Sequence, residues 1–178
     1  MTRFVTVLVV AGSFLLFARP VAKAQPEEGQ YYLIKNVNSK KALSVEAKGK
    51  EEGAKIVQVV PGGAELQQWK FVKNGDFYNI INRKTGRALN VQNESKEEGT
   101  PIIQWDAKDN NYENQQWSLE KKGKHFVIKA RHSGMVLDVA EGSKDRKAPL
   151  IQWPFNEGRN QIFELEPEIA AANLAQRP

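Results

Sequence analysis

The sequence contains no cysteine. Without thiols the chain has no disulfide, no zinc–thiolate site and no cysteine nucleophile. Histidine is nearly as scarce, with only His125 and His132. No serine or carboxylate stands at a spacing that predicts a catalytic triad with His132, which lies in a predicted turn. No acidic stretch carries the glycine and distal glutamate of a calcium-binding loop. We therefore expect no catalytic set, no metal site and no cofactor.

Long apolar runs are also scarce. One uncharged run, Phe4 to Phe17, follows Arg3 and precedes Ala22-Lys23-Ala24, which has the small-x-small form of a signal-peptidase site. The run is too short for a comfortable membrane span. We predict that residues 1–24 are a signal peptide cleaved near Ala24, and that the protein is exported, either secreted or periplasmic. An uncleaved N-terminal anchor is the alternative. No second apolar span follows, so no membrane span is expected in the mature chain.

Net charge is small once residues 1–24 are set aside. The chain has 26 basic and 21 acidic residues, and this segment holds Arg3, Arg19 and Lys23 but no acid, which leaves 23 basic against 21 acidic residues and a net charge of +2. This balance gives no reason to expect a nucleic-acid partner. A mature chain of this size buries roughly 70% of its unfolded surface, enough for a core without covalent staples.

The sequence does contain a threefold internal repeat. Its copies open at Tyr31–Asn36, Phe77–Asn82 and His125–Ala130, with starts 46 and 48 residues apart. Three further short segments follow in the same order in each copy. They are Ala42–Val45, Ile56–Val59 and Gln67–Trp69 in the first copy, Ala88–Val91, Ile102–Trp105 and Gln115–Trp117 in the second, and Val136–Val139, Leu150–Trp153 and Gln161–Phe163 in the third.

The segments have the pattern of β-strands. Apolar residues alternate with period two, and turn formers such as Thr85-Gly86 and Asn74-Gly75 separate the segments. Three copies of four strands give twelve strands. A propeller needs at least four blades, whereas three units close into a barrel with a hairpin cap. We therefore predict an all-β fold, a β-trefoil of three four-stranded repeats with pseudo-threefold symmetry.

The predicted domain boundaries follow from the repeats. The trefoil domain is expected over residues 25–166, with repeats at about 31–72, 77–120 and 125–166. A C-terminal tail, residues 167–178, follows; Ile169 to Leu174 is compatible with either a short helix or an unstructured segment.

Three short motifs that recur in the same order resemble those of a known family. They are a Gln-x-Trp ending, a Leu-Asp-Val motif (Leu137–Val139) and an Ile-Gln-Trp motif (Ile151–Trp153). Their order is similar to that in ricin-type (R-type, ricin B-like) β-trefoil lectins. The match covers about Tyr31 to Glu166. The departures are Phe163 in place of the last tryptophan and the absence of the cysteines that many plant members carry. The resemblance implies a carbohydrate-binding protein.

The tryptophans divide into two classes. Trp69 and Trp117, with Phe163 at the equivalent place, are each followed two residues later by an apolar side chain, which predicts packing in the core. Trp105 and Trp153 instead end apolar segments and precede loops. A flat ring at such a rim matches the C–H face of a pyranose, and a nearby carboxylate accepts hydrogen bonds from sugar hydroxyls.

The resemblance implies a sugar site in the third repeat made by Asp138, Trp153 and Asn160, with Gln152 and Gln161 as further candidates. In plant members the site glutamine stands two residues before the tryptophan, whereas Gln152 stands one before it. The second repeat offers Asn90, Trp105 and Asn114, where the amide replaces the acid. In the first repeat the same places hold Ser44, Val59 and Leu66, and no site is expected.

These residues together predict an exported lectin, without enzymatic activity, that binds glycans or polysaccharide of a galactose-type or xylan-like kind. The alternative is a trefoil that binds protein through its rim aromatics, Trp105, Trp153 and Phe155. An enzyme is a third interpretation. The sequence gives no indication of the oligomeric state.

Overall fold

The computed structural model describes residues 25–46, 51–107 and 112–168. The predicted signal peptide, residues 1–24, and the tail from residue 169 onward lie outside the described residues. Twelve strands occur in the described part of the chain, and each repeat contributes four. They are β1 (Tyr31–Asn36), β2 (Ala42–Val45), β3 (Ile56–Val59), β4 (Gln68–Asn74), β5 (Phe77–Asn82), β6 (Ala88–Val91), β7 (Ile102–Trp105), β8 (Gln116–Lys122), β9 (His125–Ala130), β10 (Val136–Val139), β11 (Leu150–Trp153) and β12 (Phe163–Pro167).

Six of the strands close into an antiparallel barrel. β1 pairs with β4, β4 with β5, β5 with β8, β8 with β9, β9 with β12, and β12 returns to β1. β12 includes Pro167, the first residue of the predicted tail, which pairs with Tyr32. Because the ring is closed, its strands leave no free sheet edge.

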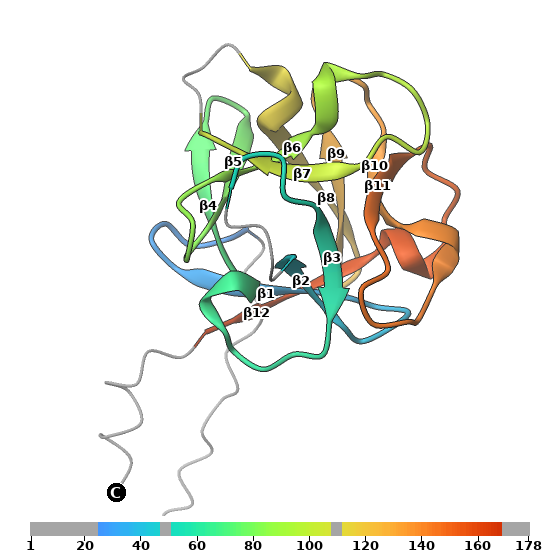
Figure 1. Ribbon diagram of the computed structural model, residues 1–178, viewed down its shortest axis with the longest axis horizontal. Coiled ribbons are helices and arrows are strands. Elements are labelled where there is room, and N and C mark those ends of the chain that lie inside the picture. The colour runs from blue at the N-terminus through green and yellow to red at the C-terminus, as the bar shows by residue number, and fades with distance from the viewer. Residues whose placement is uncertain (1–24, 47–50, 108–111, 169–178) are drawn as a thin grey trace, which may run out of the picture.

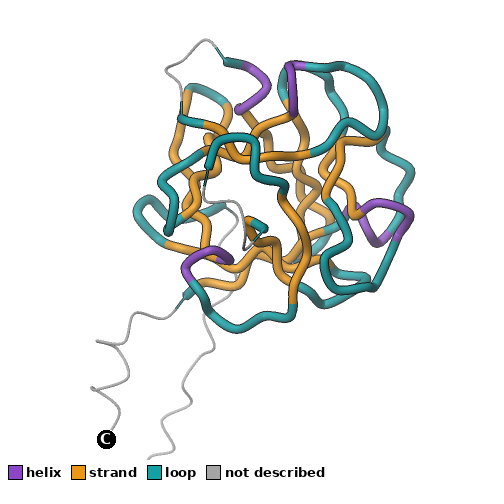
Figure 2. The backbone as a smooth tube through the Cα atoms, in the orientation of Figure 1, coloured by secondary structure: helices purple, strands orange, loops and turns teal. Residues whose placement is uncertain are grey.

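The other six strands form three hairpins, β2–β3, β6–β7 and β10–β11. Isolated bridges join the hairpins to one another: Lys55 with Ile103, Val57 with Pro149, and Pro101 with Ile151. Figure 1 shows β3, β7 and β11 around the middle of the view. Short 3-10 turns and loops connect the strands (Figure 2). A six-stranded barrel capped by three hairpins is a β-trefoil, which confirms the predicted fold.

The core follows the threefold repeat. Trp69, Trp117 and Phe163 are completely buried, and the two indole N–H groups donate to the carbonyls of Leu43 (3.1 Å) and Leu89 (3.0 Å). Equivalent buried residues from the three repeats surround them: Ile34, Ile80 and Ile128; Leu43, Leu89 and Leu137; Val45, Val91 and Val139; Ile56, Ile102 and Leu150. Full burial of each such aliphatic side chain contributes about 1.5–3 kcal/mol. The prediction that the Gln-x-Trp tryptophans pack the core is confirmed.

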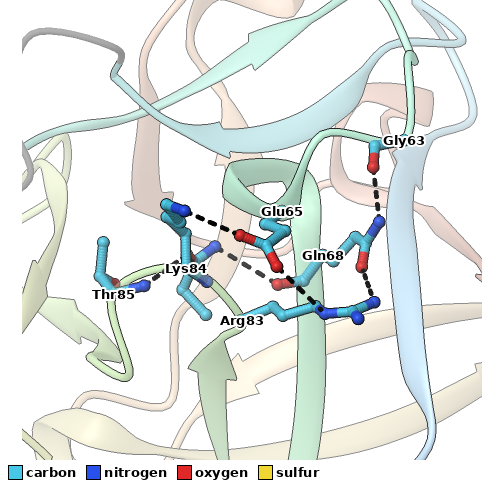
Figure 3. A network of polar contacts seen from close by, with 7 residues as sticks. Gly63, Glu65, Gln68, Arg83, Lys84 and Thr85 are labelled. Atoms are coloured by element: carbon cyan, nitrogen blue, oxygen red, sulfur yellow. Dashed lines mark hydrogen bonds and ion pairs between the residues drawn. The ribbon is translucent and has the colours of Figure 1, made fainter.

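Polar networks mark the junctions between repeats. Gln68 donates to the carbonyl of Gly63 and accepts from Arg83, whose guanidinium also faces Glu65 (Figure 3). Lys84 completes the network with a 3.0 Å contact to Glu65.

The next junction repeats this arrangement. Arg131 donates to Gln116 and pairs with Glu113 at 3.0 Å. At the third junction the two equivalent places hold Ile162 and Val37, and only the backbone bond between them remains (2.9 Å). Ile162, the middle residue of the third Gln-x-Trp motif, therefore stands opposite another apolar residue, Val37.

Three glutamines tie consecutive repeats together. Gln58, Gln104 and Gln152 are completely buried. Each accepts a hydrogen bond from a hydroxyl in the turn of its own repeat, supplied by Ser39 (2.6 Å), Thr85 (2.8 Å) and Ser133 (2.8 Å). Each amide N–H group donates to loop carbonyls of the preceding repeat, in cyclic order. These bonds satisfy buried polar groups that would otherwise cost about 1–3 kcal/mol each.

Candidate functional site

A surface pocket of about 670 Å³ lies on the third repeat. Asp138, Trp153 and Asn160 all line it, so the structure brings together the three residues that the resemblance implied. The remaining wall comes from Gly99, Ala140, Glu141, Gly142, Ile151 and Asn156.

The register of the β10–β11 hairpin explains why these residues converge. Asp138 stands opposite Ile151, and Val136 stands opposite Trp153. Directly paired residues, and residues two apart on one strand, share a face of the sheet. Asp138, Ile151 and Trp153 therefore lie on the outer face of the hairpin, whereas Leu137 and Gln152 lie on the face toward the core.

Asp138 is the buried acidic group of the pocket, only 3% exposed, whereas Glu141 in the same wall is exposed. Its two carboxylate oxygens accept one hydrogen bond each, from the side-chain amides of Asn160 (2.9 Å) and Gln161 (2.8 Å). Burial raises the pKa of Asp138 above its usual value, and these two bonds oppose the rise. Each oxygen keeps a further lone pair, so the carboxylate is oriented and still able to accept from a ligand.

Trp153 forms the aromatic side of the pocket. Its side chain is 37% exposed, in contrast to the fully buried Trp69 and Trp117. The position at the end of β11, on the outer face, leaves the ring at the pocket rim. A rigid ring beside an oriented carboxylate is the arrangement that a pyranose needs, since one sugar face is apolar and its edge carries hydroxyls.

Asn160 and Gln161 come from the 3-10 turn η5 (Arg159–Gln161). Asn160 also donates to the carbonyl of Val139 (3.2 Å) and lines the pocket. Gln161 is completely buried, donates to the carbonyl of Pro154 (2.9 Å) and accepts from the backbone of Asn156 (2.9 Å). Gln161 therefore orients both the carboxylate of Asp138 and the loop that follows β11, which contains Pro154 and Asn156.

Gln152 does not take part in the pocket. Its amide oxygen accepts from Ser133, and its nitrogen donates to the carbonyls of Ser95 (2.9 Å) and Glu97 (2.8 Å). The inward direction of Gln152 has a simple cause: neighbouring residues of a strand face opposite sides, so an outward Trp153 requires an inward Gln152.

A second, smaller pocket of about 200 Å³ lies at the equivalent place in the second repeat. The predicted residues Asn90, Trp105 and Asn114 line it, and Trp105 is 37% exposed, like Trp153. Asn114 donates to the carbonyl of Val91 (3.0 Å), as Asn160 does to Val139. Asn90 supplies no charge at the place of Asp138.

Sequence reasoning missed several residues that line the pockets. Tyr112, 42% exposed, adds a second aromatic side chain to the pocket of the second repeat. Glu141 and Asn156 line the larger pocket. Tyr112 and Asn156 belong to loops and Glu141 to the 3-10 turn η4 (Ala140–Gly142), where strand periodicity gives no direction. Phe155 is 39% exposed but is not part of the described pocket lining; the Lys122 ammonium stands 5.1 Å from its ring centre.

The first repeat lacks these groups. Ser44 is buried and its hydroxyl donates to the carbonyl of Val45 (2.9 Å). Val59 occupies the place of the rim tryptophan.

Among the described residues, no group of three metal-ligating side chains occurs. In the same part of the chain, no helix is both long and apolar enough to cross a membrane.

Comparison with known proteins agrees with this geometry. The family model for the ricin-type beta-trefoil lectin domain-like family matches residues 17–105 and 113–176. The chain belongs to this family. As a member of the ricin-type lectin family it has a fold that supports carbohydrate binding in general. No curated protein matches the chain.

Solved structures similar to this chain include a designed protein, a lectin and part of an enzyme. It is 36% identical to the designed three-fold symmetric protein ThreeFoil, with a TM-score of 0.74 over 76% of this chain and 97% of that one. It is 34% identical to 1,3Gal43A, an exo-beta-1,3-galactanase from Clostridium thermocellum, with a TM-score of 0.76 over 81% of this chain but only 31% of the enzyme. A ricin B-like lectin from Macrolepiota procera, solved in complex with lactose, is 19% identical, with a TM-score of 0.71 over 81% of this chain and 99% of that one. That last likeness shows the fold alone.

Proposed function

We propose that the protein is an exported lectin that binds glycans reversibly, without cleaving them, through the pocket of the third repeat and a second pocket in the second repeat. The observation that carries this proposal is the convergence of Asp138, Trp153 and Asn160 on one open pocket. Each of these side chains supplies a different part of sugar recognition.

The proposed binding mode follows from the chemistry of a pyranose. The apolar C–H face of the sugar lies against the ring of Trp153. Two neighbouring hydroxyls donate to the free lone pairs of Asp138, whose oxygens already face Asn160 and Gln161. Asn160 completes the polar edge with its amide. Galactose-type and xylan-like sugars are the proposed ligands, and the 34% identity to the exo-beta-1,3-galactanase 1,3Gal43A supports the first of these.

Affinity at one site is expected to be weak. A shallow pocket that holds a single sugar gives a Kd of about 1 mM, or roughly −4 kcal/mol. Two pockets on one rigid body raise the effective affinity for a polymer or surface that presents many sugars. The proposed export to the outside of the cell, by cleavage near Ala24, would place the protein where such targets occur.

Titration of the mature protein with galactose, lactose and xylo-oligosaccharides, followed by tryptophan fluorescence, tests the proposal. Trp153→Ala and Asp138→Ala should each remove most of the response from the third-repeat pocket. Phe155→Ala is the matched control, because this exposed aromatic follows Trp153 by two residues but is not part of the described pocket lining. A response that survives both pocket variants and disappears in the control would assign the sugar elsewhere.

Two further measurements separate the other functional classes. A partner protein that remains bound in excess free sugar would favour a protein-binding trefoil. Shortened products from a labelled oligosaccharide would show bond cleavage and contradict simple binding.

A further inference from the structure

The rim tryptophan of each pocket lies against a loop of the preceding repeat. Gly99, which precedes β7 of the second repeat, lines the pocket of the third. A Cβ atom built on Gly99 would lie 3.6 Å from Cζ3 of Trp153. A Cβ atom built on Gly53 of the first repeat would lie 3.8 Å from Cζ3 of Trp105. The same ring atom thus faces an equivalent glycine in both repeats, although only Gly99 is part of a described pocket lining.

Hydrogen bonds hold each glycine beside its tryptophan. Gly99 donates its backbone N–H to the carbonyl of Gln152 (2.9 Å), the residue just before Trp153. Gly53 donates in the same way to Gln104 (2.9 Å), just before Trp105. The loop before Gly99 is also bound by the side chain of Gln152, and His132 Nε2 lies 2.9 Å from the carbonyl of Ser95. Each glycine is therefore held next to its tryptophan by a backbone hydrogen bond to the residue that precedes the tryptophan.

The third loop provides an internal comparison. Lys147 occupies the place of Gly53 and Gly99, and its backbone N–H donates to Gln58 (2.8 Å) by the equivalent bond. The residue after Gln58 is Val59, in the repeat that has no tryptophan at that place. All three residues have a positive φ, +81° at Gly53, +77° at Gly99 and +71° at Lys147. Lys147 shows that this loop can hold a side chain at a positive φ, at a strain of about 1–2 kcal/mol that any non-glycine residue would carry there. The two glycines occur in the two loops that face a tryptophan ring.

We propose that Gly99 and Gly53 are positioning residues that seat the rim tryptophan of the following repeat, so that the orientation of each rim ring depends on the repeat before it. An added methyl group would stand at ordinary contact distance from the ring. A longer side chain would start from that same point and would have to displace the ring or cover it. The absence of a side chain at these two places keeps the ring in the position that faces the pocket.

The test compares Gly99→Lys with Gly99→Ala. The lysine variant introduces the residue that the chain itself has at 147. Both variants carry the same strain of a side chain at a positive φ, so the difference between them reports the longer side chain. Affinity of the third-repeat pocket should fall by roughly tenfold or more in Gly99→Lys, since a site must be held to about 0.5 Å, and by no more than about threefold in Gly99→Ala. Gly53→Lys should have the same effect on the second-repeat pocket only.

The readout is the set of four indole N–H signals in an NMR spectrum, assigned with single Trp→Phe variants. Trp69 and Trp117 are buried donors to backbone carbonyls and serve as internal references. In the ligand-free protein, Gly99→Lys should move the Trp153 signal and leave the other three in place. Gly53→Lys should move the Trp105 signal alone, and Lys147→Gly should move neither.

Two results would overturn the proposal: a Gly99→Lys variant with wild-type Trp153 signal and affinity, or equal changes at all four tryptophans in every variant. The measurement of sugar affinity rests on the proposed function, whereas the changes in the indole N–H signals of the ligand-free protein do not. If no sugar moves Trp153 in the wild-type protein, the lectin proposal fails, and the ligand-free spectra still decide whether the glycine seats the ring.

Discussion

Asp138→Asn removes the buried carboxylate of the third-repeat pocket, leaves the exposed Glu141 in its wall, and keeps the shape of the side chain. It makes this pocket resemble that of the second repeat, where Asn90 stands at the same place. A hydrogen bond to a charged group contributes about 1.5–3 kcal/mol, against about 1 kcal/mol for a neutral one. The difference is therefore about 0.5–2 kcal/mol, and a value of about 1.4 kcal/mol within this range corresponds to a tenfold weaker Kd.

Stability should respond differently from binding. Burial raises the pKa of Asp138 in the folded protein, so the protonated form is favoured by folding. The stability linked to this group is fully present below the unfolded pKa of about 3.9 and is lost as pH rises through the folded value. At neutral pH the charged carboxylate therefore carries a cost that Asp138→Asn relieves. The variant also loses one of two amide bonds, about 0.5–1.5 kcal/mol, so the two effects largely offset one another.

Isothermal titration with lactose and urea denaturation, each from pH 3 to pH 8, measure both effects. Wild-type binding should weaken as pH falls through the raised pKa of Asp138, because the protonated acid loses an acceptor. Binding by Asp138→Asn should not change over that range, and its stability should stay within about 1 kcal/mol of the wild type at neutral pH. Unchanged affinity in Asp138→Asn, or the same pH profile in both proteins, would refute the reasoning.

Two further predictions follow from the comparison of repeats. Asn90→Asp should raise the sugar affinity of the second-repeat pocket by about tenfold, because of the same difference between charged and neutral hydrogen bonds. A titration followed at Trp105 measures this affinity. A lower affinity would show that the surroundings of Asn90 do not support a charge. Trp117→Phe should lower the free energy of unfolding by about 1–3 kcal/mol in urea, because the carbonyl of Leu89 loses its 3.0 Å partner while buried; a loss below about 0.5 kcal/mol would contradict that account.

Strand positions were predictable because the sequence carries them locally. Period-two alternation and turn formers identify the opening segments that became β1, β5 and β9, and the repetition at near-constant spacing identifies the trefoil. The core role of Trp69 followed from the apolar residue two places later. Each of these signals depends only on neighbours in the chain.

The site was predictable only in part. Asp138 and Trp153 share a face through the register of one hairpin, so local pattern and family resemblance agree. Gln152 was assigned by resemblance, although strand alternation already pointed it away from Trp153. Gly99 and Tyr112 reach the pockets from loops, and the contact of Gly99 with the next repeat depends on the closed threefold arrangement. No pattern along the chain carries that information.

A crystal structure of the mature protein with lactose tests the central claim most directly. We predict a sugar in the third-repeat pocket, with its C–H face on the ring of Trp153 and two hydroxyls within hydrogen-bond distance of Asp138. A sugar held at Phe155, or at any place that contacts neither Trp153 nor Trp105, would contradict it.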